Sequence, residues 1–211
     1  RRGAAWLGWD IGKGCTVAHP TLTGIDLPTL TEKPRTYGFH ATIKPPFVLK
    51  LGMTEAGLKY TIKEICSSLP QVTLQGLEVV PLGRFLALCP KGDVSGLTAL
   101  AASVVRSLDM FRAPMSEAEL QRRNHSHLTS AQRQNLQDWG YPHVMDQFRF
   151  HMTLTGRMPK SDLEQAQRSA ADYFAADTNS PLHINDLTLV GQGDDGRFVE
   201  IERFPLGTAN Q

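Results

Sequence analysis

Two histidines with matching neighbours are the residues of this sequence best suited to chemistry. Residues 37–47 read Tyr-Gly-Phe-His-Ala-Thr-Ile-Lys-Pro-Pro-Phe, and residues 148–157 read Phe-Arg-Phe-His-Met-Thr-Leu-Thr-Gly-Arg. Both contain Phe-His-x-Thr followed by an aliphatic residue. One neutral imidazole can accept a proton while a second, protonated one donates a proton, because the reference pKa of histidine, about 6.5, is close to neutral pH. The repeated motif therefore predicts a pair of proton carriers acting on one substrate.

The residues around the histidines suit a phosphate group. Both motifs are rich in strand-forming residues, and alternation along a strand puts every second side chain on the same face. Threonine hydroxyls can donate to phosphate oxygens, and lysine and arginine add positive charge. The predicted polar faces carry His40, Thr42 and Lys44 in the first strand, and Arg149, His151 and Thr153 in the second. Tyr37 has the opposite parity to His40, so a regular strand would turn it towards the core.

Hydrophobic periodicity and turn residues predict the elements that position the motifs. Apolar residues at helical spacing predict helices over about 54–68 and 95–111. Thr129-x-x-Gln132 and Ser161-x-x-Glu164 resemble capping boxes, which predict helices ending near Gly140 and Ala176. Strands are predicted over 4–11, 72–80, 84–89, 182–190 and 197–204.

The order of these elements indicates an internal duplication. Gly83-Arg84-Phe85 lies 43 positions after His40, and Gly196-Arg197-Phe198 lies 45 positions after His151. We therefore expect an α+β fold of two pseudo-symmetric lobes, each with an antiparallel sheet flanked by helices, and a cleft between the lobes. The expected organisation is one bilobal domain over residues 1–211. Lobe 1 covers about 30–112, lobe 2 covers about 143–206, and an N-terminal strand 4–11 is added.

Composition narrows the possible partners. The 211 residues carry a formal net charge of +1, with 41% hydrophobic and 20% charged residues, so no broad basic surface favours nucleic acid. Three scattered cysteines point to a reducing compartment, and we expect a cytoplasmic protein. No metal-ligand spacing and no run of roughly 18 apolar residues is present, so neither a metal, another cofactor nor a membrane is expected. The sequence leaves the oligomeric state open.

The paired motifs resemble the 2H phosphoesterase superfamily, named for its two histidines. The longer strings at 37–47 and 148–156, with Trp139-Gly-Tyr-Pro142 and Ala5-Trp-Leu-Gly-Trp9, are similar to the bacterial branch encoded with phosphonate-degradation genes. This resemblance covers nearly the whole chain. It implies catalytic roles for His40, Thr42, His151 and Thr153.

The same resemblance implies a substrate. The expected activity is metal-independent hydrolysis of a small sugar cyclic phosphate, 5-phosphoribosyl 1,2-cyclic phosphate, to ribose 1,5-bisphosphate in phosphonate metabolism. A second phosphate on that substrate would give Tyr37, Lys44 and Arg149 binding roles. Two alternatives stay open: a 2′,3′-cyclic phosphodiesterase acting on RNA ends, and a non-catalytic module that binds a nucleotide or RNA. Which histidine would be the base and which the acid is also open.

Overall fold

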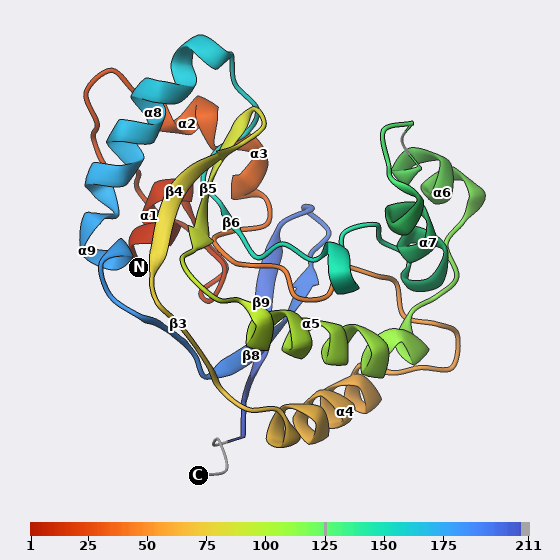
Figure 1. Ribbon diagram of the computed structural model, residues 1–211. Coiled ribbons are helices and arrows are strands. Elements are labelled where there is room, and N and C mark those ends of the chain that lie inside the picture. The colour runs from red at the N-terminus through yellow and green to blue at the C-terminus, as the bar shows by residue number, and fades with distance from the viewer. Residues whose placement is uncertain (125, 208–211) are drawn as a thin grey trace.

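A computed structural model describes residues 1–124 and 126–207 of the chain. It is a mixed structure of helices and short antiparallel sheets (Figure 1), which confirms the predicted α+β class. The helices are α1 (Arg2–Leu7), α2 (Leu27–Leu30), α3 (Glu32–Arg35), α4 (Glu55–Ser68), α5 (Ser95–Leu108), α6 (Glu117–Arg123), α7 (Ser130–Trp139), α8 (Lys160–Tyr173) and α9 (Ala175–Thr178), with 3-10 turns η1 (Asp109–Phe111) and η2 (Met145–Gln147). The strands are β1 (Trp9–Asp10), β2 (Cys15–Thr16), β3 (Val72–Leu74), β4 (Leu77–Leu82), β5 (Phe85–Pro90), β6 (Met152–Thr153), β7 (Leu182–Ile184), β8 (Asp186–Gln192) and β9 (Phe198–Pro205).

The sheet that carries the second motif has the order β4-β5-β6, and all its strands are antiparallel. In its register Val79 pairs with Leu88, and Leu88 pairs with Met152. These three side chains are buried in the core, whereas Glu78, the neighbour of Val79, is exposed. The face that carries Glu78 is exposed or half-buried in β4, whereas Ala87 and Cys89 on the same face of β5 are also buried. The other described pairings are β1-β2, β3-β7 and β8-β9.

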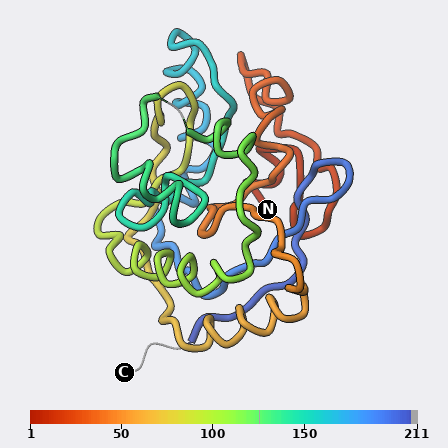
Figure 2. The backbone as a smooth tube through the Cα atoms, turned by 90° about the vertical axis from the view of Figure 1, so that its right-hand side faces the viewer, coloured from red at the N-terminus to blue at the C-terminus, as the bar shows by residue number. Residues whose placement is uncertain are grey.

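Two clusters of buried hydrophobic residues stabilise the fold. The first lies where α8 packs on β4 and β5, and it includes Trp6, Leu86, Leu154 and Phe174. The second lies where α4 packs on α5 and on β8 and β9, and it includes Phe204. In both views of the chain, α4 and α5 run along the end of the molecule farthest from α8 (Figures 1 and 2). The second motif contributes Phe150 and Met152 to the first cluster, and Ile43 of the first motif packs against both clusters.

Several helix predictions are confirmed. The stripe predicted over 54–68 is α4, and the one predicted over 95–111 is α5 followed by η1. The capping box of Thr129 and Gln132 is present in full, with both reciprocal hydrogen bonds, and it opens α7. Gly140 ends α7 in the left-handed conformation, at φ 74°, which glycine adopts without steric cost.

The prediction of a strand over 4–11 is wrong, because residues 2–7 form α1 and only Trp9 and Asp10 are a strand. A short apolar run does not distinguish a strand from a buried helix turn by periodicity. Here the helix is favoured because it buries Trp6 and Leu7 together in the core. The indole of Trp6 also donates a hydrogen bond to the carbonyl of Leu154, at 2.8 Å.

Other boundaries are also corrected. Ser161 does not cap α8, since the helix already begins at Lys160 and Pro159 occupies the N-cap position without a side-chain hydrogen bond. The strand predicted over 72–80 is divided at Gly76, whose φ of 146° interrupts the extended chain. The strand predicted over 182–190 is likewise divided into β7 and β8. The strand predicted at the first motif is not formed, since the described residues of that segment contribute a single bridge, between Ala41 and Met152. The strand predicted at the second motif is reduced to the two residues of β6.

Two glycines in the same left-handed conformation allow a matched test of the turn before the first motif. Gly38 has φ 69° and Gly83 has φ 67°, but a Cβ on Gly38 would lie 3.0 Å from the Cβ of Ile11, whereas nothing lies within 4 Å of one on Gly83. We expect Gly83→Ala to cost roughly 1–2 kcal/mol of unfolding free energy from the backbone alone. Gly38→Ala should cost roughly 1 kcal/mol or more beyond that, from overpacking. Urea denaturation measures both, and equal losses would contradict the close packing of this turn.

Candidate functional site

The two motifs lie side by side although more than a hundred residues separate them in the sequence. Ala41 and Met152, the residues between each histidine and its threonine, form an antiparallel bridge. In an antiparallel pair the partner numbers run in opposite directions, so this register sets His40 across from Thr153 and Thr42 across from His151. Each histidine therefore lies opposite the threonine of the other motif. The structure brings the four residues predicted as catalytic into one group.

The two imidazole rings are oriented in the same way. Nδ1 of His40 lies 3.1 Å from the carbonyl oxygen of Gly38, and Nδ1 of His151 lies 2.8 Å from that of Arg149. A carbonyl can only accept a hydrogen bond, so each Nδ1 carries the proton and donates it. Nε2 is then left to meet a ligand. In the first motif Nε2 already accepts a hydrogen bond from the hydroxyl of Thr42, at 2.9 Å.

Burial decides the protonation of the first histidine. Desolvation lowers the pKa of His40 below its usual value, and the nearby His151 lowers it further. Hydrogen bonds with the backbone at Gly38 and Tyr37 oppose this shift. The His40 ring is therefore neutral at neutral pH when the site is empty, and the two rings are close enough for the charge of one to affect the other.

Tyr37 joins the group, contrary to what strand parity indicates. The left-handed conformation of Gly38 reverses the direction of the chain between Tyr37 and His40, so a simple alternation does not hold. The tyrosine ring lies edge-on to the His40 ring, with centroids 5.6 Å apart. Burial raises the pKa of Tyr37, while a side-chain hydrogen bond with Thr153 opposes the rise. Its hydroxyl therefore contacts the threonine of the second motif.

Lys44 is held away from the histidines. Its ammonium group lies 3.2 Å from the carboxylate of Asp109 and 3.2 Å from the carbonyl oxygen of Val105, and only 7% of its side chain is exposed. Burial lowers the pKa of Lys44, and the charge of Asp109 opposes this. Through these contacts Lys44 connects the end of the first motif to α5 and η1. Arg112 also forms an ion pair with Asp109.

Arg149 has a different position from Lys44. It is exposed, and it lines a cavity of about 310 Å³ beside β4 and β5, together with Glu78, Cys89 and Thr98. Cys89 is buried, and burial raises the pKa of its thiol. Of the three predicted binding residues, the structure brings Tyr37 to the histidine pair, places Arg149 in an adjoining cavity, and uses Lys44 in an ion pair.

Two residues near the site were not expected from the sequence. His143 stood alone in the sequence, but burial lowers its pKa, and His151 is among the nearby charges that lower it further. The ring of Tyr141 lies edge-on to His143 at 5.8 Å, and the charge of Tyr141 affects the pKa of Tyr37. Gly140 turns the chain from α7 towards β6 and so presents both residues. Two sequence signals point to them: both residues are close to the second motif, and Tyr141 belongs to the segment 139–142 that is part of the family resemblance.

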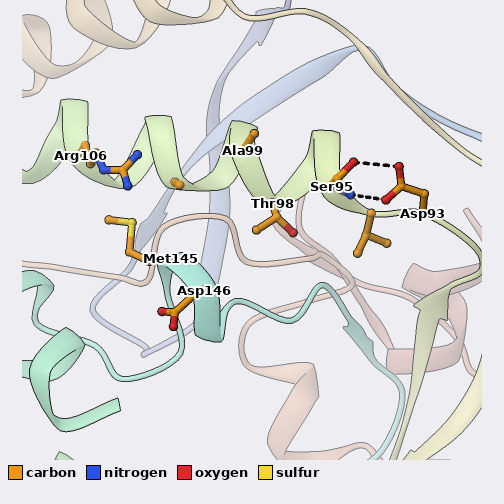
Figure 3. Close-up of a pocket in the computed structure, with 9 residues that line it drawn as sticks. Asp93, Ser95, Thr98, Ala99, Arg106, Met145 and Asp146 are labelled. Carbon is orange, nitrogen blue, oxygen red and sulfur yellow. Dashed lines mark hydrogen bonds between the residues drawn. The ribbon is translucent and has the colours of Figure 1, made fainter. Parts of the chain in front are cut away.

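The cavity of about 600 Å³ shown in Figure 3 lies between α5 and the turn η2, and it shares Val94 and Thr98 with the smaller cavity at Arg149. Arg106, Asp146 and Met145 line it, and Asp93 accepts two hydrogen bonds from Ser95 at one end. None of the sequence-predicted site residues is among its lining residues. We therefore place the candidate site at the two motifs and not in this larger cavity.

Within residues 1–124 and 126–207, no group of three or more histidine, cysteine, aspartate or glutamate side chains is arranged to hold a metal ion. In the same residues, no helix has both the length and the apolar character needed to cross a membrane. Cys15, Cys66 and Cys89 are free thiols.

The sequence matches one family profile over residues 42–199, the family described as protein of unknown function (DUF1045). The match covers most of the chain, so the protein belongs to this family. It includes Thr42 and the whole second motif and begins just after His40.

Two curated bacterial proteins are similar over nearly all of this chain. One, from Janthinobacterium sp. (strain Marseille), is 36% identical over 97% of this chain and 47% of its own length. The other, from Laribacter hongkongensis (strain HLHK9), is 31% identical over 96% of this chain and 47% of its own length. Both are named ribose 1,5-bisphosphate phosphokinase PhnN. The chain spans about half the length of the curated relatives it matches.

These names correct the predicted reaction. The sequence was expected to encode a cyclic phosphodiesterase, a hydrolase, whereas the relatives are named as kinases, which transfer a phosphoryl group. The predicted hydrolytic function and its RNA-directed form are therefore wrong. The compound named in the relatives, ribose 1,5-bisphosphate, is nevertheless the one that the sequence interpretation gave as the product.

The neutral, buried His40 predicts a pH dependence of stability. Its pKa in the folded protein lies below the value of about 6.5 expected for the unfolded chain, so the unfolded state binds more protons as the pH falls. The stability that neutral His40 contributes above pH 6.5 is therefore lost as the pH falls through the pKa of His40 in the folded protein. We expect His40→Gln to reduce the loss of unfolding free energy between pH 7.5 and pH 5, measured by urea denaturation. An unchanged loss in the variant would contradict a buried, neutral His40.

Proposed function

We propose that this chain binds a phosphorylated ribose, of the class of ribose 1,5-bisphosphate, with one phosphate held between His40 and His151. The observation that carries this proposal is the Ala41–Met152 bridge, which puts each histidine opposite the threonine of the other motif. The curated relatives support the choice of ligand, because their names contain this compound. The identity of the sugar and the position of its bound phosphate are part of the proposal.

The group has the donors that a phosphate needs. Nε2 of each histidine is directed away from the backbone carbonyl that its Nδ1 contacts, and the hydroxyls of Thr42 and Thr153 lie beside them. A phosphate monoester offers three non-bridging oxygens with negative charge. A charge-assisted hydrogen bond between such an oxygen and a protonated histidine is worth roughly 1.5–3 kcal/mol. Tyr37, whose hydroxyl contacts Thr153, completes the polar surface.

The proposed role in the relatives' reaction is to hold the sugar, not the phosphoryl donor. The 211 residues contain no Gly-x-x-x-x-Gly-Lys-Ser/Thr sequence, the loop that cradles nucleotide phosphates in many kinases. The relatives are about twice as long as this chain, so the donor site in them is assigned to the part that this chain does not match. His40, Thr42, His151 and Thr153 then act as the residues that bind and orient the phosphate of the acceptor.

The arrangement of the two halves supports the resemblance to the 2H superfamily in fold. The helix that follows the first motif, α4, packs on the later hairpin β8-β9. The helix that follows the second motif, α8, packs on the earlier hairpin β4-β5. Each half thus covers the hairpin of the other, as a duplicated chain with exchanged elements would do. The predicted lobes, about 30–112 and 143–206, stay a prediction, as does the cytoplasmic location.

Substitution of the histidines tests the binding site. We expect wild-type protein to bind ribose 1,5-bisphosphate by isothermal titration calorimetry, and His40→Gln and His151→Gln each to weaken binding roughly tenfold or more, because each removes a charge-assisted donor. His183→Gln is the matched control, since His183 is an exposed histidine on β7 that contacts Thr73. Equal affinities in all four proteins would contradict the site, and no binding by the wild type would overturn the proposed function.

Protonation should accompany binding. Burial lowers the pKa of His40 and keeps its ring neutral before a ligand binds. An anion bound at Nε2 favours the protonated ring, so binding raises the pKa of His40. We expect the complex to take up protons near pH 7, and the affinity to increase as the pH falls from 8 towards 6.5. Calorimetry in buffers with different ionisation enthalpies measures the uptake. His40→Gln should take up fewer protons, and identical uptake in the two proteins would contradict this role of His40.

A further inference from the structure

We propose that the cavity lined by Arg149, Glu78 and Thr98 binds the second phosphate and the hydroxyl groups of the same sugar. This inference rests on the proposed function, because it assumes that the first phosphate lies at the histidine pair. It assigns a role to a cavity of about 310 Å³, which is at the small end of the range of about 300–1,000 Å³ for ligand pockets. The inferred ligand is therefore a compact sugar bisphosphate and not a nucleotide.

The cavity lies on the same face of the sheet as the second motif. In the register of β4 and β5, Glu78 pairs with Cys89, and both line the cavity. In the register of β5 and β6, Ala87 pairs with Thr153 and Leu88 with Met152, so the next residue, Cys89, is opposite His151. The cavity therefore adjoins the second motif, because Phe148, Arg149 and Phe150, which directly precede His151, line it.

The charged groups of the cavity are available to a ligand. Within residues 1–124 and 126–207, neither Arg149 nor Glu78 forms an ion pair, although both are close enough to Cys89 to affect the pKa of its thiol. Both side chains are exposed. A guanidinium group can grip a phosphate with two parallel hydrogen bonds, and a carboxylate accepts from sugar hydroxyls. One cation and one acceptor in the same cavity match a ligand with both an anion and hydroxyls.

The distance between Arg149 and His151 also fits one ligand that reaches both residues. Arg149 and His151 are two residues apart, which corresponds to roughly 7 Å along an extended chain. The carbonyl of Arg149 is already fixed by Nδ1 of His151, so the two residues keep a set relation. In ribose 1,5-bisphosphate the furanose ring separates the two phosphates by a comparable length. Val80, Val94 and Phe148 add an apolar wall for the carbon side of the ring.

Comparison of ligands with one and two phosphates tests this subsite. We expect Arg149→Met to weaken binding of ribose 1,5-bisphosphate roughly tenfold or more, and to change the affinity for inorganic phosphate by less than about twofold. Arg149→Lys should have an intermediate effect, since it keeps the charge and loses the two-pronged geometry. Arg106→Met is the matched control, because Arg106 is an exposed arginine on α5 that lines the other cavity (Figure 3). It should leave the affinity for both ligands unchanged.

The outcomes separate the two proposals. If wild-type protein binds neither ligand, the proposed function fails, and the subsite fails with it. If the wild type binds both ligands and Arg149→Met weakens neither, or weakens both equally, the subsite alone is overturned. A second measurement follows Glu78→Ala, which should weaken binding of ribose 1,5-bisphosphate but not of pyrophosphate, a ligand without hydroxyls. Equal effects on these two ligands would also overturn the subsite, and thermal unfolding of each variant shows that it is folded.

Discussion

One backbone pairing, between Ala41 and Met152, is the contact on which the candidate site depends. It joins two segments that are distant in the sequence, and it fixes which side chains face one another. A shift of one residue would turn one motif's histidine to the opposite face of the sheet, because side chains alternate along a strand. The pairing is short, so it depends on the structures on either side to hold it in register.

Those structures act through buried contacts of different kinds. On the side of the second motif, the backbone N–H groups of Leu154 and Met158 donate to β5 and to the turn before it, and the hydroxyl of Thr155 accepts from the N–H of Leu86. The indole of Trp6 donates to Leu154 from the other side. On the side of the first motif, the buried pair of Lys44 and Asp109 connects the chain to η1. Removal of Asp109 would leave the buried charge of Lys44 unpaired, which is costly.

The same residue types are compatible with more than one reaction at phosphorus. Two imidazoles, two hydroxyls and an arginine recognise a phosphorylated sugar whether the bond that changes lies in the ligand itself or in a donor bound elsewhere. The names of the relatives favour transfer over hydrolysis, and this chain matches only about half of each relative. In the function proposed above, this chain supplies recognition of the sugar, and the cavity beside the second motif extends that recognition from one phosphate to the whole ligand.

The sequence by itself determined the α+β class, the helices α4, α5 and α7, and the two motifs, because each depends on residues that are close together in the chain. Local periodicity could not predict that α1 is a helix. Its six residues, which include Trp6 and Leu7, are apolar enough for either a strand or a helix, and only burial in the core decides between the two. Parity gave the wrong direction for Tyr37 because it ignores the left-handed conformation of Gly38. Only the tertiary structure decided three features: the closeness of His143 to His151, the ion pair of Lys44 with Asp109, and the cavity at Arg149. Each results from the packing of segments against one another, and no local sequence pattern encodes how such segments lie in space.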